Sequence, residues 1–159
     1  MITRTLMPGG WHLYRPAGNV KTCRPEWNEQ VDFVAWVREW WPEDAATMFH
    51  PVNEGDIPVQ YRQDQLKAGL LPGVSDVILM RHGWRWPSAV IEMKRDWWKS
   101  KPSPQQLAFL ESCAADGKFC AVANGADAAK VAFMEYRKGF ECAGVGVSVA
   151  LPLIIGGGK

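Results

Sequence analysis

Three charged residues in the middle of the chain have types and spacing that suit hydrolysis of a phosphodiester bond. Asp76 lies in the segment GVSDV, and Glu92 and Lys94 lie in the segment VIEMK. Carboxylate oxygens suit Mg²⁺ or Mn²⁺, and a bound cation offsets the cost of placing carboxylates beside apolar strands. Lys94 can orient or deprotonate an attacking water, or stabilise charge on the phosphate. A surface ion pair would show the same Glu-x-Lys spacing, so the surrounding elements must discriminate between the two readings.

A predicted β-hairpin places these three residues together. The pattern predicts one strand over 74–80, a turn around His82 and Gly83, and a second strand over 89–93. Residues two apart on a strand share a face, so Glu92 and Lys94 point one way and Met93 points the other. The hairpin brings Asp76 beside Glu92, at the edge of an otherwise apolar sheet.

Helices and further strands surround this hairpin. Apolar residues at helical spacing predict a first helix over 26–41, with Trp40 on its buried face and Trp36 off it. A short strand over 48–52 and a short polar helix over 60–68 precede the hairpin. Ser103, Pro104 and Gln106 are typical of a capped helix start. An apolar strand over 119–123 and a helix over 126–138 follow, so the order α-β-β-β-α-β-α predicts an α/β fold, a mixed β-sheet flanked by helices.

The length of 159 residues predicts one domain. Residues 1–24, rich in Gly, Pro and Arg, are interpreted as an irregular N-terminal arm, and residues 26–138 as the core. The apolar, Gly-rich tail 139–159 is either a final strand or a dimer contact, with 145–155 and the off-face tryptophans as candidate interface residues.

Composition indicates an ordinary globular protein. The net charge of +1 gives no evidence for nucleic acid, so any such binding requires a local patch. No apolar run reaches the length of a membrane span, and the N-terminal segment has no apolar leader region. The cysteines at positions 23, 113, 120 and 142 form no CxxC pair, which favours reduced thiols in a cytoplasmic protein over a zinc site. The histidines, His12, His50 and His82, show no ligand spacing, and we interpret His50 as structural.

Four segments in order resemble the VRR-NUC branch of the PD-(D/E)xK nuclease superfamily. They are GVSDV, VIEMK, SPQQLAFL and GKFCAVANG, and the resemblance covers about residues 48–136. Ser75 stands where the family usually has a proline, a position that varies in the superfamily. The resemblance implies a restriction-endonuclease-like fold.

The resemblance also implies roles for individual residues. Asp76 and Glu92 become metal ligands, the Met93 carbonyl a third ligand, and Lys94 the catalytic lysine. Gln106 matches the glutamine of the helix that follows the active-site strands, although its position also suits a capping box.

The family places a further acidic residue on the first helix. Glu26, with Gln30 four positions later, fits that pattern as a metal ligand, and Glu29 is the alternative. Either acid would also complement the helix dipole. Asn53 and Glu54, beside the predicted first strand, are weaker candidates for the site.

Basic residues predominate around the second hairpin strand, where they alternate with tryptophans. This composition is typical of contact with a phosphate backbone and exposed bases. A solvated loop with tryptophans folded onto the core is the alternative. The expected nucleic-acid contacts are Arg81, Arg85, Arg95, Lys99 and Lys101, and the tryptophans are Trp84, Trp86, Trp97 and Trp98.

Together these features predict a Mg²⁺- or Mn²⁺-dependent, structure-selective DNA endonuclease acting on branched or flapped DNA. The resemblance implies a stand-alone protein of phage or bacterial type, acting in the bacterial cytoplasm as a homodimer similar to Holliday-junction resolvases. The alternatives are a catalytically silent nucleic-acid-binding protein with a nuclease fold, and an exonuclease or nicking enzyme with the same site.

Overall fold

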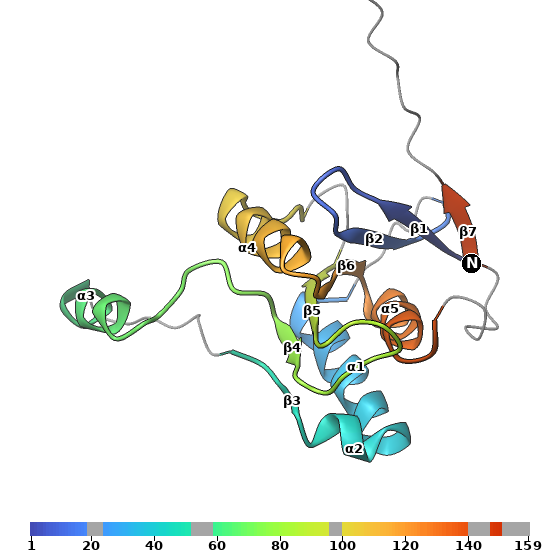
Figure 1. The fold of residues 1–159 in the computed structure, drawn as a ribbon, viewed down its shortest axis with the longest axis horizontal. Helices are drawn as coiled ribbons and strands as arrows, with labels where there is room; N and C mark the ends of the chain where they lie inside the picture. Colours follow the sequence, from blue (N-terminus) through green and yellow to red (C-terminus); the bar gives the residue numbers. More distant parts are fainter. Residues whose placement is uncertain (19–23, 52–58, 96–99, 140–146, 151–159) are drawn as a thin grey trace, which may run out of the picture.

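The computed structural model describes residues 1–18, 24–51, 59–95, 100–139 and 147–150, and shows helices packed against both faces of a mixed sheet (Figure 1). In chain order the elements are β1 (Ile2–Leu6), β2 (His12–Pro16), α1 (Glu26–Trp40), α2 (Pro42–Ala45), β3 (Met48–Phe49), α3 (Val59–Lys67), β4 (Val77–Leu79), β5 (Ala89–Lys94), α4 (Pro104–Ala115), β6 (Phe119–Asn124), α5 (Ala126–Lys138) and β7 (Val147–Ala150). The predicted order of elements over 26–138 is confirmed, apart from the additional short helix α2.

The strands of the described segments form one sheet in the order β3-β4-β5-β6-β2-β1-β7. β4 and β5 pair antiparallel, as the hairpin prediction requires. β6 lies between β5 and β2 and is parallel to both, so it occupies the centre of the sheet. Its continuous apolar run suits this position, because both faces of a central strand are covered.

Alternation along β5 assigns its residues to the two faces of the sheet. Ile91 and Met93 are buried in the cluster that α1 and α5 cover, which includes Phe33 and Phe133. Val90 is buried in the smaller cluster under α4, with Leu110. Glu92 and Lys94 continue the face of Val90, so the predicted separation of Glu92 and Lys94 from Met93 is confirmed.

The prediction of an irregular arm over 1–24 is wrong. β1 and β2 form an antiparallel pair through a turn that includes Gly10 at φ 82°, and β2 then pairs with β6. Gly and Pro in this segment mark the turn between two strands. The strands were not evident because β2 pairs with a strand more than 100 residues later, and local composition does not reveal such a partner.

The aromatic face of α1 is rotated from its predicted position. Trp36 is half-buried against Phe133, with ring centroids 5.6 Å apart, whereas Trp40 is 64% exposed. Phe33 and Val37 are buried as expected. The prediction that Trp40 packs in the core is therefore wrong.

The C-terminal strand, the cysteines and the lengths of the helices bear on the other predictions. β7 pairs parallel with β1, so this part of the tail is a strand. Cys113 and Cys120 are free thiols, and the other two cysteines lie outside the described residues. Among the described helices, none has the length and apolar character needed to cross a membrane.

Candidate active site

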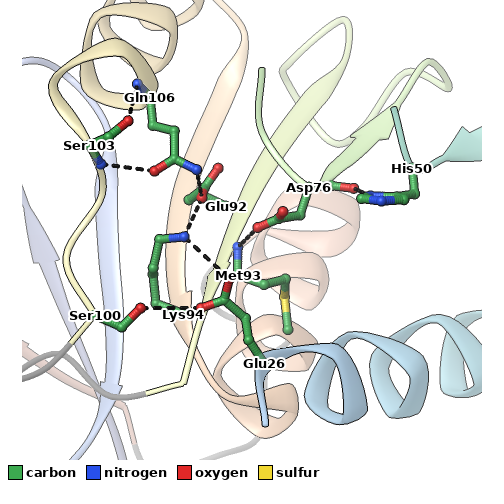
Figure 2. A network of polar contacts seen from close by, with 9 residues as sticks. All are labelled: Glu26, His50, Asp76, Glu92, Met93, Lys94, Ser100, Ser103 and Gln106. Atoms are coloured by element: carbon green, nitrogen blue, oxygen red, sulfur yellow. Dashed lines mark hydrogen bonds and ion pairs between the residues drawn. The ribbon is translucent and has the colours of Figure 1, made fainter. Parts of the chain in front are cut away.

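The ends of two neighbouring strands bring the predicted acidic residues together (Figure 2). β4 and β5 pair with Val77 opposite Ile91, so Asp76, directly before β4, lies beside Glu92. The Oδ2 atom of Asp76 accepts a hydrogen bond of 2.7 Å from the main-chain N–H of Met93. The hairpin register therefore holds the Asp76 carboxylate at the end of β5, as predicted.

Glu92 is completely buried, and its two carboxylate oxygens have different surroundings. Oε1 lies 2.6 Å from Nζ of Lys94 and accepts a 2.5 Å hydrogen bond from Nε2 of Gln106. Oε2 is also buried and has no hydrogen-bond partner of good geometry among the residues that the structure describes. Burying a carboxylate oxygen in this way costs free energy, which the nearby Ser75 hydroxyl offsets in part and a bound cation would offset further.

Gln106 connects the acidic cluster to the start of α4. Its Oε1 accepts a 2.8 Å hydrogen bond from the main-chain N–H of Ser103, and its own N–H donates to Oγ of Ser103 at 3.2 Å. This is the expected capping box. The same side chain donates through Nε2 to Glu92, so capping and support of the site are combined in one residue (Figure 2).

The two acidic residues at the start of α1 have different partners. Glu26 lies 3.4 Å from Nζ of Lys94 and accepts a 3.2 Å hydrogen bond from Oγ of Ser100. Glu29 points elsewhere: its Oε2 accepts from the main-chain N–H of Ala126 at 2.7 Å and so caps α5. Of the two acids, Glu26 is the one that contacts a residue of the predicted site, and that contact is with the lysine ammonium.

Burial and proximity raise the pKa of both strand carboxyls. Burial, followed by the neighbouring charge of Asp76, raises the pKa of Glu92 to about 8, against the opposing effect of Lys94. Burial also raises the pKa of Asp76, although the hydrogen bond from Met93 partly offsets it. These pKa shifts are typical of carboxylates assembled to share a cation.

Lys94 keeps its proton in this arrangement. Burial alone would lower its pKa, but the adjacent carboxylate of Glu92, with smaller effects from Glu26 and Asp76, raises it overall. Lys94 is thus an ammonium group at neutral pH. This favours a role in orienting water and stabilising negative charge over a role as the base.

The donor set fits a hard divalent cation. Two carboxylates lie at one strand edge, and one of them has a buried oxygen with no hydrogen-bond partner among the described residues. In the described part of the chain, no three His, Cys, Asp or Glu side chains gather as a metal site, so Glu26 does not complete one here. A main-chain carbonyl, water or phosphate oxygen would complete the shell, as is usual for Mg²⁺. Asn53 and Glu54 lie outside the described residues.

Two residues at the site were not predicted for it. Asn124, at the end of β6 and paired in register with Lys94, is 5% exposed, and neither polar atom of its side chain has a hydrogen-bond partner among the residues that the structure describes. Nδ1 of His50 lies 2.6 Å from the main-chain oxygen of Asp76 (Figure 2). In the sequence, the position of His50 close to the candidate residues Asn53 and Glu54 is the signal that could have placed it near the site.

The predicted basic residues that the structure describes fall into two groups. Arg81 pairs with Glu43, and Arg85 lies over the ring of Trp86, and both precede β5 in the chain. Lys94 lies at the other end of β5, five residue steps or about 17 Å from Ala89, the first residue of that strand. Arg95 follows Lys94 directly and is exposed, as is Lys101, whereas Lys99 lies outside the described residues.

The described tryptophans of this segment differ in their exposure to solvent. Trp86 packs on Phe119 with ring centroids 4.8 Å apart, whereas Trp84 is exposed. Trp97 and Trp98 lie outside the described residues. The alternative of tryptophans folded onto the core therefore holds for Trp86.

Comparison with known proteins supports the fold independently. The chain is similar to a solved structure described as a VRR_NUC domain protein, with a TM-score of 0.63 and 19% sequence identity over 72% of this chain and 89% of that one. A scan against models of protein families found no match, and neither did a search of curated proteins. The likeness shows the fold, and confirms the predicted restriction-endonuclease-like sheet of the VRR-NUC type.

Proposed function

We propose that the protein is a Mg²⁺- or Mn²⁺-dependent deoxyribonuclease. The observation on which this rests is the convergence of Asp76, Glu92 and Lys94 at the ends of two paired strands, with one buried oxygen of Glu92 lacking a hydrogen-bond partner among the described residues. The nuclease-type fold supports the same reading. A surface ion pair no longer accounts for these residues, because Glu92 and Lys94 are both buried.

Each residue has a defined part in the proposed reaction. Asp76 and Glu92 would hold the divalent ion, with the Met93 carbonyl as a further ligand. The ion, when bound, supplies stabilisation of phosphate charge and activation of a water molecule. Lys94, kept protonated by its carboxylate neighbours, orients water and stabilises the negative charge that develops on the phosphate.

The surrounding residues keep these groups in place. Gln106 holds the orientation of Glu92 by donating to Oε1, and Ser103 fixes Gln106. Glu26 contacts the Lys94 ammonium, and Ser100 holds Glu26 by donating a hydrogen bond to its other carboxylate oxygen. Such support matters because a misplacement of about 1 Å in a catalytic group lowers the rate substantially.

The finer part of the proposal concerns the substrate and the assembly. We propose an endonuclease that acts on branched or flapped DNA, as a homodimer that places two sites on opposed strands. Arg95, Lys99 and Lys101, near the end of β5, are the proposed backbone contacts closest to the site. Arg81 and Arg85 precede β5, so they would contact only DNA that extends along the protein surface away from the site.

Cleavage assays with labelled linear duplex, flap and four-way-junction DNA test the proposal. We expect cutting with Mn²⁺ and none with EDTA, and Lys94→Ala should lower the rate by at least about 100-fold. Absence of metal-dependent cutting on every substrate would refute the enzymatic function and leave a silent binding protein. Persistent cutting by Lys94→Ala would refute the site assignment.

The pattern of products tests the finer proposal. Paired, symmetric cuts across a four-way junction, together with a dimeric mass in solution, are expected for a resolvase-like dimer. Release of single nucleotides from ends would identify an exonuclease, and isolated nicks in duplex would identify a nicking enzyme.

A further inference from the structure

An exposed indole lies at the rim of the proposed active site. Trp27 directly follows Glu26 on the first turn of α1, and its side chain is 64% exposed. Its ring centroid lies 6.4 Å from that of His50, with the two ring planes at 72°. Trp27 is therefore next to the site in sequence, through Glu26, and in space, through a histidine that contacts Asp76.

The contacts of His50 fix this aromatic pair relative to the acidic cluster. Nδ1 of His50 lies 2.6 Å from the main-chain oxygen of Asp76, whose carboxylate is one of the two proposed metal ligands. An edge-to-face arrangement is a favourable geometry for two aromatic rings and restricts the rotamer of the indole. Most of the Trp27 ring surface nevertheless stays in contact with solvent.

Exposure alone does not indicate function, because single exposed apolar residues are common. Trp40 illustrates this: it lies on the last turn of the same helix, is also 64% exposed, and has no residue of the proposed site beside it in sequence. The distinguishing feature of Trp27 is its position between Glu26, which pairs with Lys94, and His50, which contacts Asp76.

We infer that Trp27 stacks on an unpaired base next to the phosphate that is cut. This inference rests on the proposed nuclease function and names its substrate class: DNA with unpaired nucleotides at the cleavage position, as in flaps, overhangs and open junctions. Bases of a continuous duplex stack on each other and offer no free face, whereas an unpaired base gains stacking free energy on an aromatic side chain.

Binding measurements with Ca²⁺ in place of the proposed catalytic ion test the inference. The probes are a flap with 2-aminopurine at its first unpaired position and a fully paired duplex of the same length. Trp27→Ala should weaken binding of the flap by about 10-fold, the scale of one base–aromatic stack, and leave duplex binding unchanged. Trp27→Phe should keep most of the affinity for the flap.

The fluorescence of 2-aminopurine reports the stack itself. Wild-type protein and the control variant Trp40→Ala should quench it on binding, and Trp27→Ala should not. Equal losses of binding on flap and duplex would overturn the inference, as would no quenching by wild-type protein, or the same effect from Trp40→Ala. If Trp27→Ala does not fold, Trp27→Leu takes its place and should likewise fail to quench, and absence of quenching by wild-type protein overturns the inference without any variant.

Cleavage of the same flap with Mn²⁺ separates this inference from the proposed function. Quenching that depends on Trp27, without any cutting, would refute hydrolysis and retain the stacking site. Cutting that is indifferent to Trp27 would refute the stacking site and retain the nuclease.

Discussion

At the scale of single residues, Glu92 has contacts that do not match the requirements of a stable core. One oxygen of its carboxylate is shared by Lys94 and Gln106, and the other is buried without a hydrogen-bond partner among the described residues. Burial, followed by the neighbouring charge of Asp76, raises its pKa to about 8, so its ionised form is destabilised relative to that of an exposed glutamate. A bound cation would offset this destabilisation, because it interacts with the ionised form.

Binding of the proposed metal ion can therefore be measured without any substrate. Mn²⁺ should raise the free energy of unfolding of the wild-type protein, by about 2.7 kcal/mol when the ion is at about 100 times its Kd. Glu92→Gln should lose most of this stabilisation, whereas Lys94→Ala should keep it, because Lys94 is not a ligand. Denaturant unfolding with and without Mn²⁺ measures both effects.

The two variants distinguish binding of the ion from catalysis. Lys94→Ala is expected to bind Mn²⁺ and not cut DNA. Equal stabilisation of Glu92→Gln and wild-type protein by Mn²⁺ would contradict the assignment of Glu92 as a ligand.

At the scale of secondary-structure elements, the first turn of α1 serves two neighbours. Glu26 faces β5 and pairs with Lys94, and Glu29, almost one turn later, accepts a hydrogen bond from the first N–H of α5. Gly125, which precedes α5, offers no side chain for capping, so Glu29 supplies this function from another helix. One helix end thus contacts both Lys94, the proposed catalytic lysine, and α5.

Alanine substitutions at these two acids should have opposite consequences. Glu29→Ala removes a helix cap and should lower the free energy of unfolding by about 1 kcal/mol, with little effect on the cutting rate. Glu26→Ala should reduce cutting and change stability less, because Glu26 is more exposed. Urea unfolding and initial cleavage rates of the two variants, compared side by side, check this prediction. If Glu29→Ala were the variant that lost activity, the choice of Glu26 as the site acid would be wrong.

At the scale of the whole molecule, the sheet continues past the active site through β2 and β1. β2 lies beside β6 and buries His12 against Phe119, with ring centroids 5.4 Å apart. Burial, with a smaller contribution from Arg4, lowers the pKa of His12 from its ordinary 6.5 to about 4. Near pH 6.5, where the same histidine in an unfolded chain becomes protonated, His12 of the folded protein is therefore still neutral.

His12 should consequently make stability depend on pH. Its folded pKa lies below its unfolded value, so the unfolded chain binds more protons and stability falls as the pH drops from about 6.5 towards 4. At pH 5 the loss attributable to His12 should be about 2 kcal/mol relative to pH 8. His12→Gln should show a pH dependence that is weaker by this amount, measured by urea unfolding at both pH values. An identical pH dependence in both proteins would show that His12 is protonated or exposed when folded.

Features that depend on local pattern were predictable from the sequence. The hairpin, the shared face of Glu92 and Lys94, and the capping box at Ser103 and Gln106 all follow from residue types at short spacing, and the structure contains each of them. The reason is physical: strand alternation and helix capping are set by residues within a few positions of each other.

Other features were decided only by the tertiary structure. The pairing of β2 with β6 joins segments more than 100 residues apart, and Asn124 reaches the site only because β6 lies beside β5. The choice between Glu26 and Glu29 depends on the rotation of α1 against its neighbours, which local spacing does not determine. The sequence by itself determined which groups could perform the chemistry and on which strand face they lie. Long-range packing decided which further residues surround them, because those contacts form only when distant elements come together.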